Sequence, residues 1–116
     1  MSIEVSCGCG ASRLLIHSEG RARLLCHCSI CQRFNDAPFA DVVIFRREEA
    51  VLADASTVDF QRYKSTMAVD RGKCRACAQP FIEYLKLPLV PAMAFVPAAV
   101  LGDAITLPPP ALRLFY

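Results

Sequence analysis

The hexapeptide Cys26-His27-Cys28-Ser29-Ile30-Cys31 carries three of the seven cysteines of this 116-residue chain. The other four stand in two further clusters, Cys7-Gly8-Cys9 and Cys74-Arg75-Ala76-Cys77. An odd number of cysteines excludes complete disulfide pairing, and disulfide scaffolds tend to spread their partners along the chain. Cysteines separated by one or two residues can instead aim their sulfurs at one point about 2.3 Å away, the zinc–thiolate distance. The pattern therefore predicts metal binding rather than disulfides.

Seven thiols divide into four and three, because a closed structural zinc site takes four protein ligands and a catalytic site typically takes three. The spacing permits two partitions. In the first, one site contains Cys7, Cys9, Cys74 and Cys77, and the other contains Cys26, Cys28 and Cys31. In the second, Cys28, Cys31, Cys74 and Cys77 form one site and leave Cys7, Cys9 and Cys26. Spacing alone leaves both open, but the first is more economical because its trio is contiguous.

The composition predicts one globular domain over residues 1–116, because 54% hydrophobic and 21% charged residues can build a core. A net charge of +2 with scattered basic residues and no Trp argues against a nucleic-acid partner. Prolines interrupt the uncharged stretch 87–102, which is shorter than the roughly 20 residues of a membrane span, so no membrane partner is expected. The first residues do not resemble a signal peptide, which makes the cytoplasm the expected compartment.

Short apolar runs between turn residues predict a mainly β fold with metal-binding turns at strand ends. The expected strands cover residues 3–6, 13–17, 21–26, 39–45, 58–63, 67–69, 81–85, 93–96 and 112–116. Residues 18–20 are expected to be the turn of a hairpin between the second and third strands. Residues 28–34 suit a single helical turn. Phe34, Phe39 and Phe45 are expected in the core, with Phe34 also a candidate for lining a substrate site.

Four motifs between residues 5 and 81 follow one another in a specific order: Cys7-x-Cys9-Gly10, Cys26-His27-Cys28-x-x-Cys31-Gln32-Arg33, Ala37-Pro38-Phe39 and Arg71-x-x-Cys74-x-x-Cys77. In this order they resemble the glutathione-dependent formaldehyde-activating enzyme family, also called the centromere-protein-V-like family. The resemblance implies an Mss4-like fold of short antiparallel strands with two zinc ions per chain. It implies structural zinc at Cys7, Cys9, Cys74 and Cys77 and catalytic zinc at Cys26, Cys28 and Cys31, which supports the first partition.

The family is described as carbon–sulfur lyases, whose named member promotes condensation of formaldehyde with glutathione to S-hydroxymethylglutathione. This chain departs from the family pattern at three places outside the ligands. It has Asn35-Asp36 where the family tends to have Ser-Gly, Lys73 in place of Phe, and Ala78 in place of Gly. Related chains commonly continue past a segment such as 112–116, so an extension beyond Tyr116 is left open.

Three thiolates push charge onto a metal, so water bound there is a weaker acid than on a three-imidazole site, which disfavours hydrolysis. The open position suits a small-molecule thiol such as glutathione, held as a thiolate that attacks an aldehyde. The alternative is a non-catalytic, zinc-stabilised protein-binding module, since the same fold also serves protein recognition. A third hypothesis is a thiol or metal sensor that uses the trio. The oligomeric state is left open.

Two further groups of residues lie near the cysteines in sequence. Seven thiolates and two Zn²⁺ would change the net charge from +2 to −1, and nearby cations could offset this or bind glutathione carboxylates. The candidates are Arg33, Arg71, Lys73 and Arg75. His27 stands between two expected ligands, but adjacent side chains usually diverge, so we expect it to point away from the metal.

Overall fold

The computed structural model describes residues 2–62 and 69–114, and it confirms a mainly β fold. The strands are β1 (Ile3–Ser6), β2 (Arg13–Ile16), β3 (Ala22–Cys26), β4 (Ala40–Arg46), β5 (Ala50–Leu52), β6 (Val58–Gln61), β7 (Val69–Cys74), β8 (Pro80–Leu85), β9 (Met93–Pro97) and β10 (Pro110–Leu114). The helices are α1 (Ser29–Asn35) and α2 (Ala98–Leu101), with 3₁₀ turns at Arg47–Glu49 and Ala55–Thr57. No helix within the described ranges has the length and apolar character that crossing a membrane requires.

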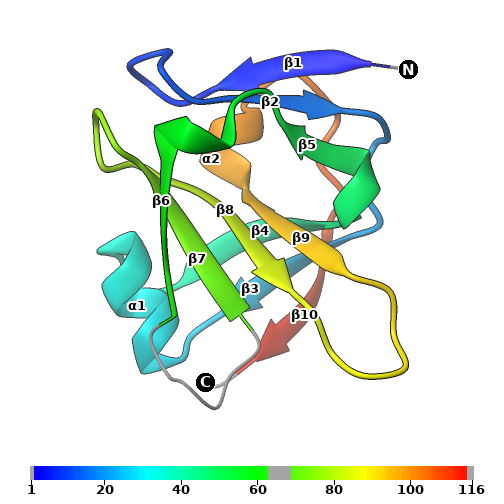
Figure 1. The fold of residues 1–116 in the computed structure, drawn as a ribbon. Coiled ribbons are helices and arrows are strands. Elements are labelled where there is room, and N and C mark those ends of the chain that lie inside the picture. Colours follow the sequence, from blue (N-terminus) through cyan, green and yellow to red (C-terminus); the bar gives the residue numbers. More distant parts are fainter. Residues whose placement is uncertain (1, 63–68, 115–116) are drawn as a thin grey trace.

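The strands form two sheets, which Figure 1 shows with the smaller one at the top. The small sheet has the order β1-β2-β5, and the large sheet has the order β10-β3-β4-β9-β8-β7-β6. Neighbouring strands pair antiparallel, as predicted, except that β10 runs parallel to β3. Because β3 lies between β4 and β10, the strand that ends at Cys26 is an interior strand of the large sheet.

The expected hairpin between residues 13–17 and 21–26 is wrong. β2 pairs instead with β1, where Val5 lies opposite Leu14, and with β5, where Ile16 lies opposite Ala50. These partners occupy both edges of β2, so residues 18–20 connect the two sheets rather than closing a hairpin. The strand β5 was missed because three residues are too few to show an alternating pattern.

The two faces of β4 belong to two different apolar clusters, because successive side chains of a strand point to opposite sides. Val43 and Phe45 join the main core, to which residues of both sheets and α2 contribute. Ala40 and Val42 join a smaller cluster that includes Cys26 and Cys31. The contiguous cysteines therefore lie on the face of β4 opposite the main core, in largely apolar surroundings.

Candidate metal centre

The first cysteine cluster brings together turns from the two sheets. Cys7 and Cys9 stand in the turn after β1, Cys74 is the last residue of β7, and Cys77 lies in the turn before β8. Their sulfurs all lie within 4.8 Å of one another, and these four residues form one of two candidate metal-binding groups among the residues that the structure describes. The structure thus forms the first of the two partitions that the spacing allowed.

The sulfur–sulfur distances in this cluster fit a tetrahedral ion. The Sγ atom of Cys7 lies 3.5 Å from that of Cys9 and 3.6 Å from that of Cys74, and Cys9 and Cys74 are 3.7 Å apart. A tetrahedron with metal–sulfur bonds of about 2.3 Å has edges of about 3.8 Å, whereas a disulfide needs about 2.05 Å. All seven cysteines are free thiols.

Two polar residues that sequence reasoning missed hold the turns of this cluster. The Gln79 side chain accepts a hydrogen bond from the backbone N–H of Gly8 at 2.6 Å and so joins the two turns. The backbone N–H of Ser12 donates to the Cys7 sulfur at 3.4 Å, and the buried Ser12 hydroxyl donates to the carbonyl of Thr57 at 3.1 Å. No signal in one sequence marks these residues, because their partners are far away along the chain.

Hydrogen bonding also favours the thiolate at one buried member of the cluster. Hydrogen bonding from Ser12, supported by the backbone N–H groups of Cys77 and Ala76, lowers the pKa of Cys74 to about 6 despite burial. At the exposed Cys9, the backbone of Ala11 favours the thiolate, but the neighbouring sulfurs of Cys7 and Cys77 outweigh it and raise the pKa to about 12. A cation among these sulfurs would favour the thiolate at every one of them.

The second cluster, which we call the trio, consists of Cys26, Cys28 and Cys31. Cys26 ends β3, Cys28 is the N-cap residue of α1, and Cys31 lies in its first turn. The Cys26 sulfur lies 3.6 Å from that of Cys28 and 3.0 Å from that of Cys31. The start of the helix therefore brings these three cysteines, which are close in sequence, toward one point. The predicted helical turn over residues 28–34 is confirmed to within one residue.

Burial and backbone contacts divide the trio electrostatically. Desolvation raises the pKa of the buried Cys26 and Cys31 thiols. Desolvation acts in the same direction on Cys28, but hydrogen bonds from the backbone N–H of Cys31, 3.3 Å from the Cys28 sulfur, and from the Cys31 and Cys26 side chains together outweigh it and lower the pKa of Cys28. The Cys28 thiol therefore ionises more readily than the thiols of Cys26 and Cys31, at which a cation would favour the thiolate.

The aromatic residues near the trio agree only in part with the sequence-based expectations. His27 is not a member of the metal-binding group, and its ring packs against Phe39 with centroids 5.2 Å apart. The expectation that Phe39 is a core residue is wrong, because it is 38% exposed at the turn before β4, where it covers His27. Phe34 and Phe45 are buried as predicted.

The candidate cations occupy different environments. Arg71 is buried and forms an ion pair with the buried Glu83, its Nε atom 2.8 Å from a carboxylate oxygen. The ammonium group of Lys73 lies 5.5 Å from the Phe34 ring centroid, beside a polar hollow of about 200 Å³ that Arg71 also lines. Arg75 donates to the carbonyl of Ser56 at 2.9 Å, and Arg33 lies on the exposed side of α1.

Two departures from the family pattern fall on strained backbone. Ala78 has φ 61° and Asp36, the C-cap residue of α1, has φ 49°, which is the left-handed region that favours glycine. These are the two positions at which the resembled family tends to have Gly. The chain therefore adopts the left-handed conformation beside both cysteine clusters with residues that carry a Cβ atom.

We expect Ala78→Gly to stabilise the protein by about 1 kcal/mol, because a left-handed conformation costs a residue with a Cβ atom roughly that much more than glycine. For a chain of this size, this corresponds to a rise in Tm of about 4 °C, measured by thermal unfolding monitored by circular dichroism. Ala76→Gly is the matched control, since Ala76 is exposed in the same turn and does not have a positive φ. Equal effects of the two substitutions would contradict the explanation.

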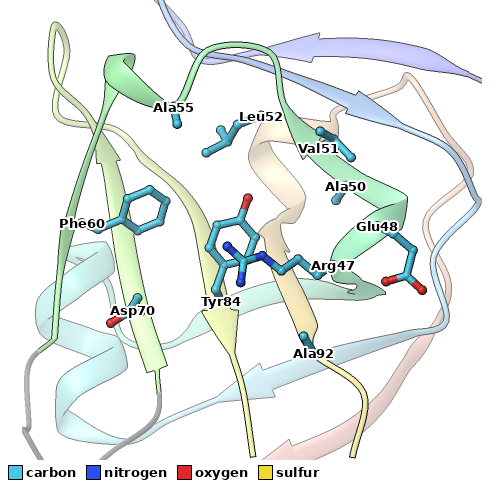
Figure 2. Close-up of a pocket in the computed structure, with 10 residues that line it drawn as sticks. All are labelled: Arg47, Glu48, Ala50, Val51, Leu52, Ala55, Phe60, Asp70, Tyr84 and Ala92. Atoms are coloured by element: carbon cyan, nitrogen blue, oxygen red, sulfur yellow. The ribbon is translucent and has the colours of Figure 1, made fainter.

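A wider hollow of about 690 Å³ lies apart from both clusters, and none of its lining residues is a cysteine. Figure 2 shows the Arg47 side chain reaching across Tyr84, with Phe60 and Leu52 nearby. The Arg47 guanidinium carbon is 4.3 Å from the Tyr84 ring centroid, and the Phe60 and Tyr84 rings stack at 5.5 Å. The volume of this hollow therefore does not make it the site at which the cysteines would act.

The fold and the site define a class: mainly β proteins in which four cysteines from strand-end turns and three from a strand–helix junction form two metal-binding groups. The chain belongs to the glutathione-dependent formaldehyde-activating enzyme family, whose model matches residues 2–116. Its Mss4-like fold follows from that membership. A crystal structure of a Rhodobacter sphaeroides protein, a structural genomics target, is similar in fold with a TM-score of 0.68 at 16% sequence identity. The similarity covers 97% of this chain and 100% of that one. No curated protein matches the sequence.

Proposed function

We propose that this protein is a zinc-dependent enzyme that adds a glutathione-type thiol to a small aldehyde and catalyses the reverse cleavage, as a carbon–sulfur lyase. The observation that carries the proposal is the trio. Its three sulfurs converge, and within the described residues no fourth ligand joins them, whereas the other group has four cysteines. Four thiolates suffice for a structural site, whereas three leave room for a substrate sulfur. Membership of the family supports the same reaction.

In this proposal the cysteines of the two groups have different roles. Cys7, Cys9, Cys74 and Cys77 would hold a structural ion that ties the turns together, and Cys26, Cys28 and Cys31 would hold the ion at which the substrate binds. A zinc ion in the trio would supply the positive charge that keeps a bound thiol deprotonated near neutral pH. We also propose a reducing compartment such as the cytoplasm, because metal-binding thiols must stay reduced.

The reaction conserves all atoms. The substrate sulfur forms a bond to the carbonyl carbon, the carbonyl π bond breaks, and the proton released by the thiol ends on the new hydroxyl oxygen. The surrounding chain orients the reactants: α1 fixes two of the three sulfurs, and Lys73 borders a polar hollow, also lined by Asp59, at which charged parts of the thiol can bind. The buried surroundings of Cys26 and Cys31 keep water from the carbon–sulfur bond.

The decisive experiment follows exchange between ¹³C-formaldehyde hydrate and S-hydroxymethylglutathione by NMR, with metal-replete protein added in catalytic amounts. We expect faster exchange than in buffer and two zinc ions per chain, one of which mild chelation removes together with the acceleration. Full metal content without any acceleration across several thiols would refute the enzyme and favour the protein-binding module. Reversible oxidation or metal exchange without turnover would favour the sensor.

A further inference from the structure

The trio borders a partly enclosed cavity of about 190 Å³ to which the proposed reaction assigns no role. Cys26 and Cys31 form part of its wall. The remaining wall is mostly aliphatic and aromatic, with Leu24, Val42, Val69, Leu85 and Phe95 among its residues. The cavity is thus distinct from the wide hollow of Figure 2, and two of its lining residues are cysteines proposed to hold the ion at which the substrate binds.

The charges in the wall of this cavity compensate each other. Arg71 and Glu83 are the charged members of the lining, and they face each other with 2.8 Å between Nε and Oε1. Their side chains are only 5% and 4% exposed, so the pair is shielded from water. A charged ligand group would lose its hydration there and find no net opposite charge, whereas a neutral apolar group would not. The charged ends of glutathione are therefore excluded from this space.

The size of the cavity exceeds the needs of formaldehyde, whose carbonyl carbon carries only hydrogen. An engineered cavity of about 150 Å³ with aliphatic and aromatic walls is enough to bind benzene. A cavity of about 190 Å³ therefore accommodates a substituent of roughly four to six carbons. Because the carbon that reacts lies next to the thiol sulfur, the group that can enter a cavity bordering the trio is the substituent of that carbon.

We propose that this cavity binds the apolar substituent of the carbonyl substrate, so that the preferred aldehydes are branched or aromatic ones such as 3-methylbutanal rather than formaldehyde. This inference rests on the proposed function and specifies its substrate class. The step is unchanged: the thiol S–H adds across the C=O bond, the C–S bond forms, and the proton goes to oxygen. Val42 and Phe95 are specificity-determining residues in this view, because their side chains set the width of the cavity.

The first test compares acceleration over the uncatalysed reaction for formaldehyde, acetaldehyde, butanal and 3-methylbutanal with glutathione. Each buried methylene contributes roughly fourfold, so 3-methylbutanal should exceed acetaldehyde in kcat/KM by roughly 60-fold. A flat or falling series with formaldehyde still active would overturn this inference alone. No acceleration with any aldehyde would instead refute the proposed function.

The second test uses substitutions that change the cavity. Val42→Phe should fill it and reduce the ratio of kcat/KM for 3-methylbutanal over acetaldehyde at least tenfold, and Phe95→Leu should widen it and shift the optimum to longer aldehydes. Val51→Phe is the matched control, since Val51 is 40% exposed on β5 and does not line the cavity. If the Val42→Phe protein does not fold, the Phe95→Leu protein provides the test. An unchanged optimum of aldehyde length in that variant would contradict the inference.

A binding measurement avoids turnover altogether. We expect 3-methylbutan-1-ol, an unreactive isostere, to shift the NMR methyl resonances of Leu24, Val42 and Leu85 in the metal-replete protein at concentrations at which methanol does not. Shifts confined to Val51 and Leu52 would place the alcohol in the wide hollow of Figure 2 instead and would overturn the assignment.

Discussion

Cys74→Ser is expected to unfold the protein or to lower its Tm by at least about 15 °C, with loss of one metal ion. Cys74 is only 2% exposed and belongs, like Cys7, to the main core. Structural zinc contributes about 10–16 kcal/mol to the folding of zinc-finger peptides, which is comparable to the whole stability of an ordinary domain. Metal content by mass spectrometry under native conditions and thermal unfolding by circular dichroism measure the two effects.

The matched control for this variant is the same substitution in the other cluster, Cys28→Ser. It replaces one sulfur by one oxygen in the same way, but in the trio, whose cysteines lie within six residues and therefore do not tie distant parts of the chain together. A Cys74→Ser protein that binds two ions and unfolds at the wild-type temperature would show that the four-sulfur group has no structural role.

Cys28→Ser is expected to reduce the acceleration of adduct formation at least about 100-fold, more than is typical for loss of an outer hydrogen-bond partner of a metal ligand. The fold should survive. Cys28 caps α1 by accepting a hydrogen bond from the backbone N–H of Cys31, and serine is among the preferred N-cap residues, so the helix start is retained. The Tm should therefore change by only a few degrees, and the ion of the four-sulfur group should remain bound.

The kinetic control is Ser29→Ala, because Ser29 is exposed, adjacent to Cys28 and outside the metal-binding group. We expect its turnover to remain within about twofold of wild type. Wild-type turnover in Cys28→Ser would remove the trio from the reaction, whatever the metal content of that variant.

The trio could be predicted from the sequence because it is local: one helical turn is enough to bring its sulfurs near one another. Within the four-sulfur group, only the pairs Cys7–Cys9 and Cys74–Cys77 are local in this sense. The assignment of Cys7 and Cys9 to Cys74 and Cys77 needed the family resemblance, since spacing left two partitions open. The structure confirms the grouping, and its physical basis is the meeting of the β1–β2 turn with the β7–β8 turn through Gln79.

The failures of the sequence reasoning have a common cause, which is pairing between distant segments. Residues 13–17 and 21–26 look like a hairpin locally, but β1 and β5 occupy the edges of β2. The exposed Phe39 is apolar and stands beside a strand, yet it covers His27 instead of entering the core. The cavity beside the trio is also invisible in the sequence, because β3, β4, β7, β8 and β9 each contribute part of its wall.

The two sulfur groups differ in how much of the chain separates their members. Cys7 and Cys74 are 67 residues apart, whereas Cys26 and Cys31 are 5 residues apart. During synthesis from the N-terminus, the ribosome has already released the whole trio when the four-sulfur group still has only half of its thiols. A nascent chain therefore carries the thiols of Cys7 and Cys9 without their partners until Cys74 and Cys77 emerge, and in that interval these thiols can form wrong disulfides unless the surroundings are reducing.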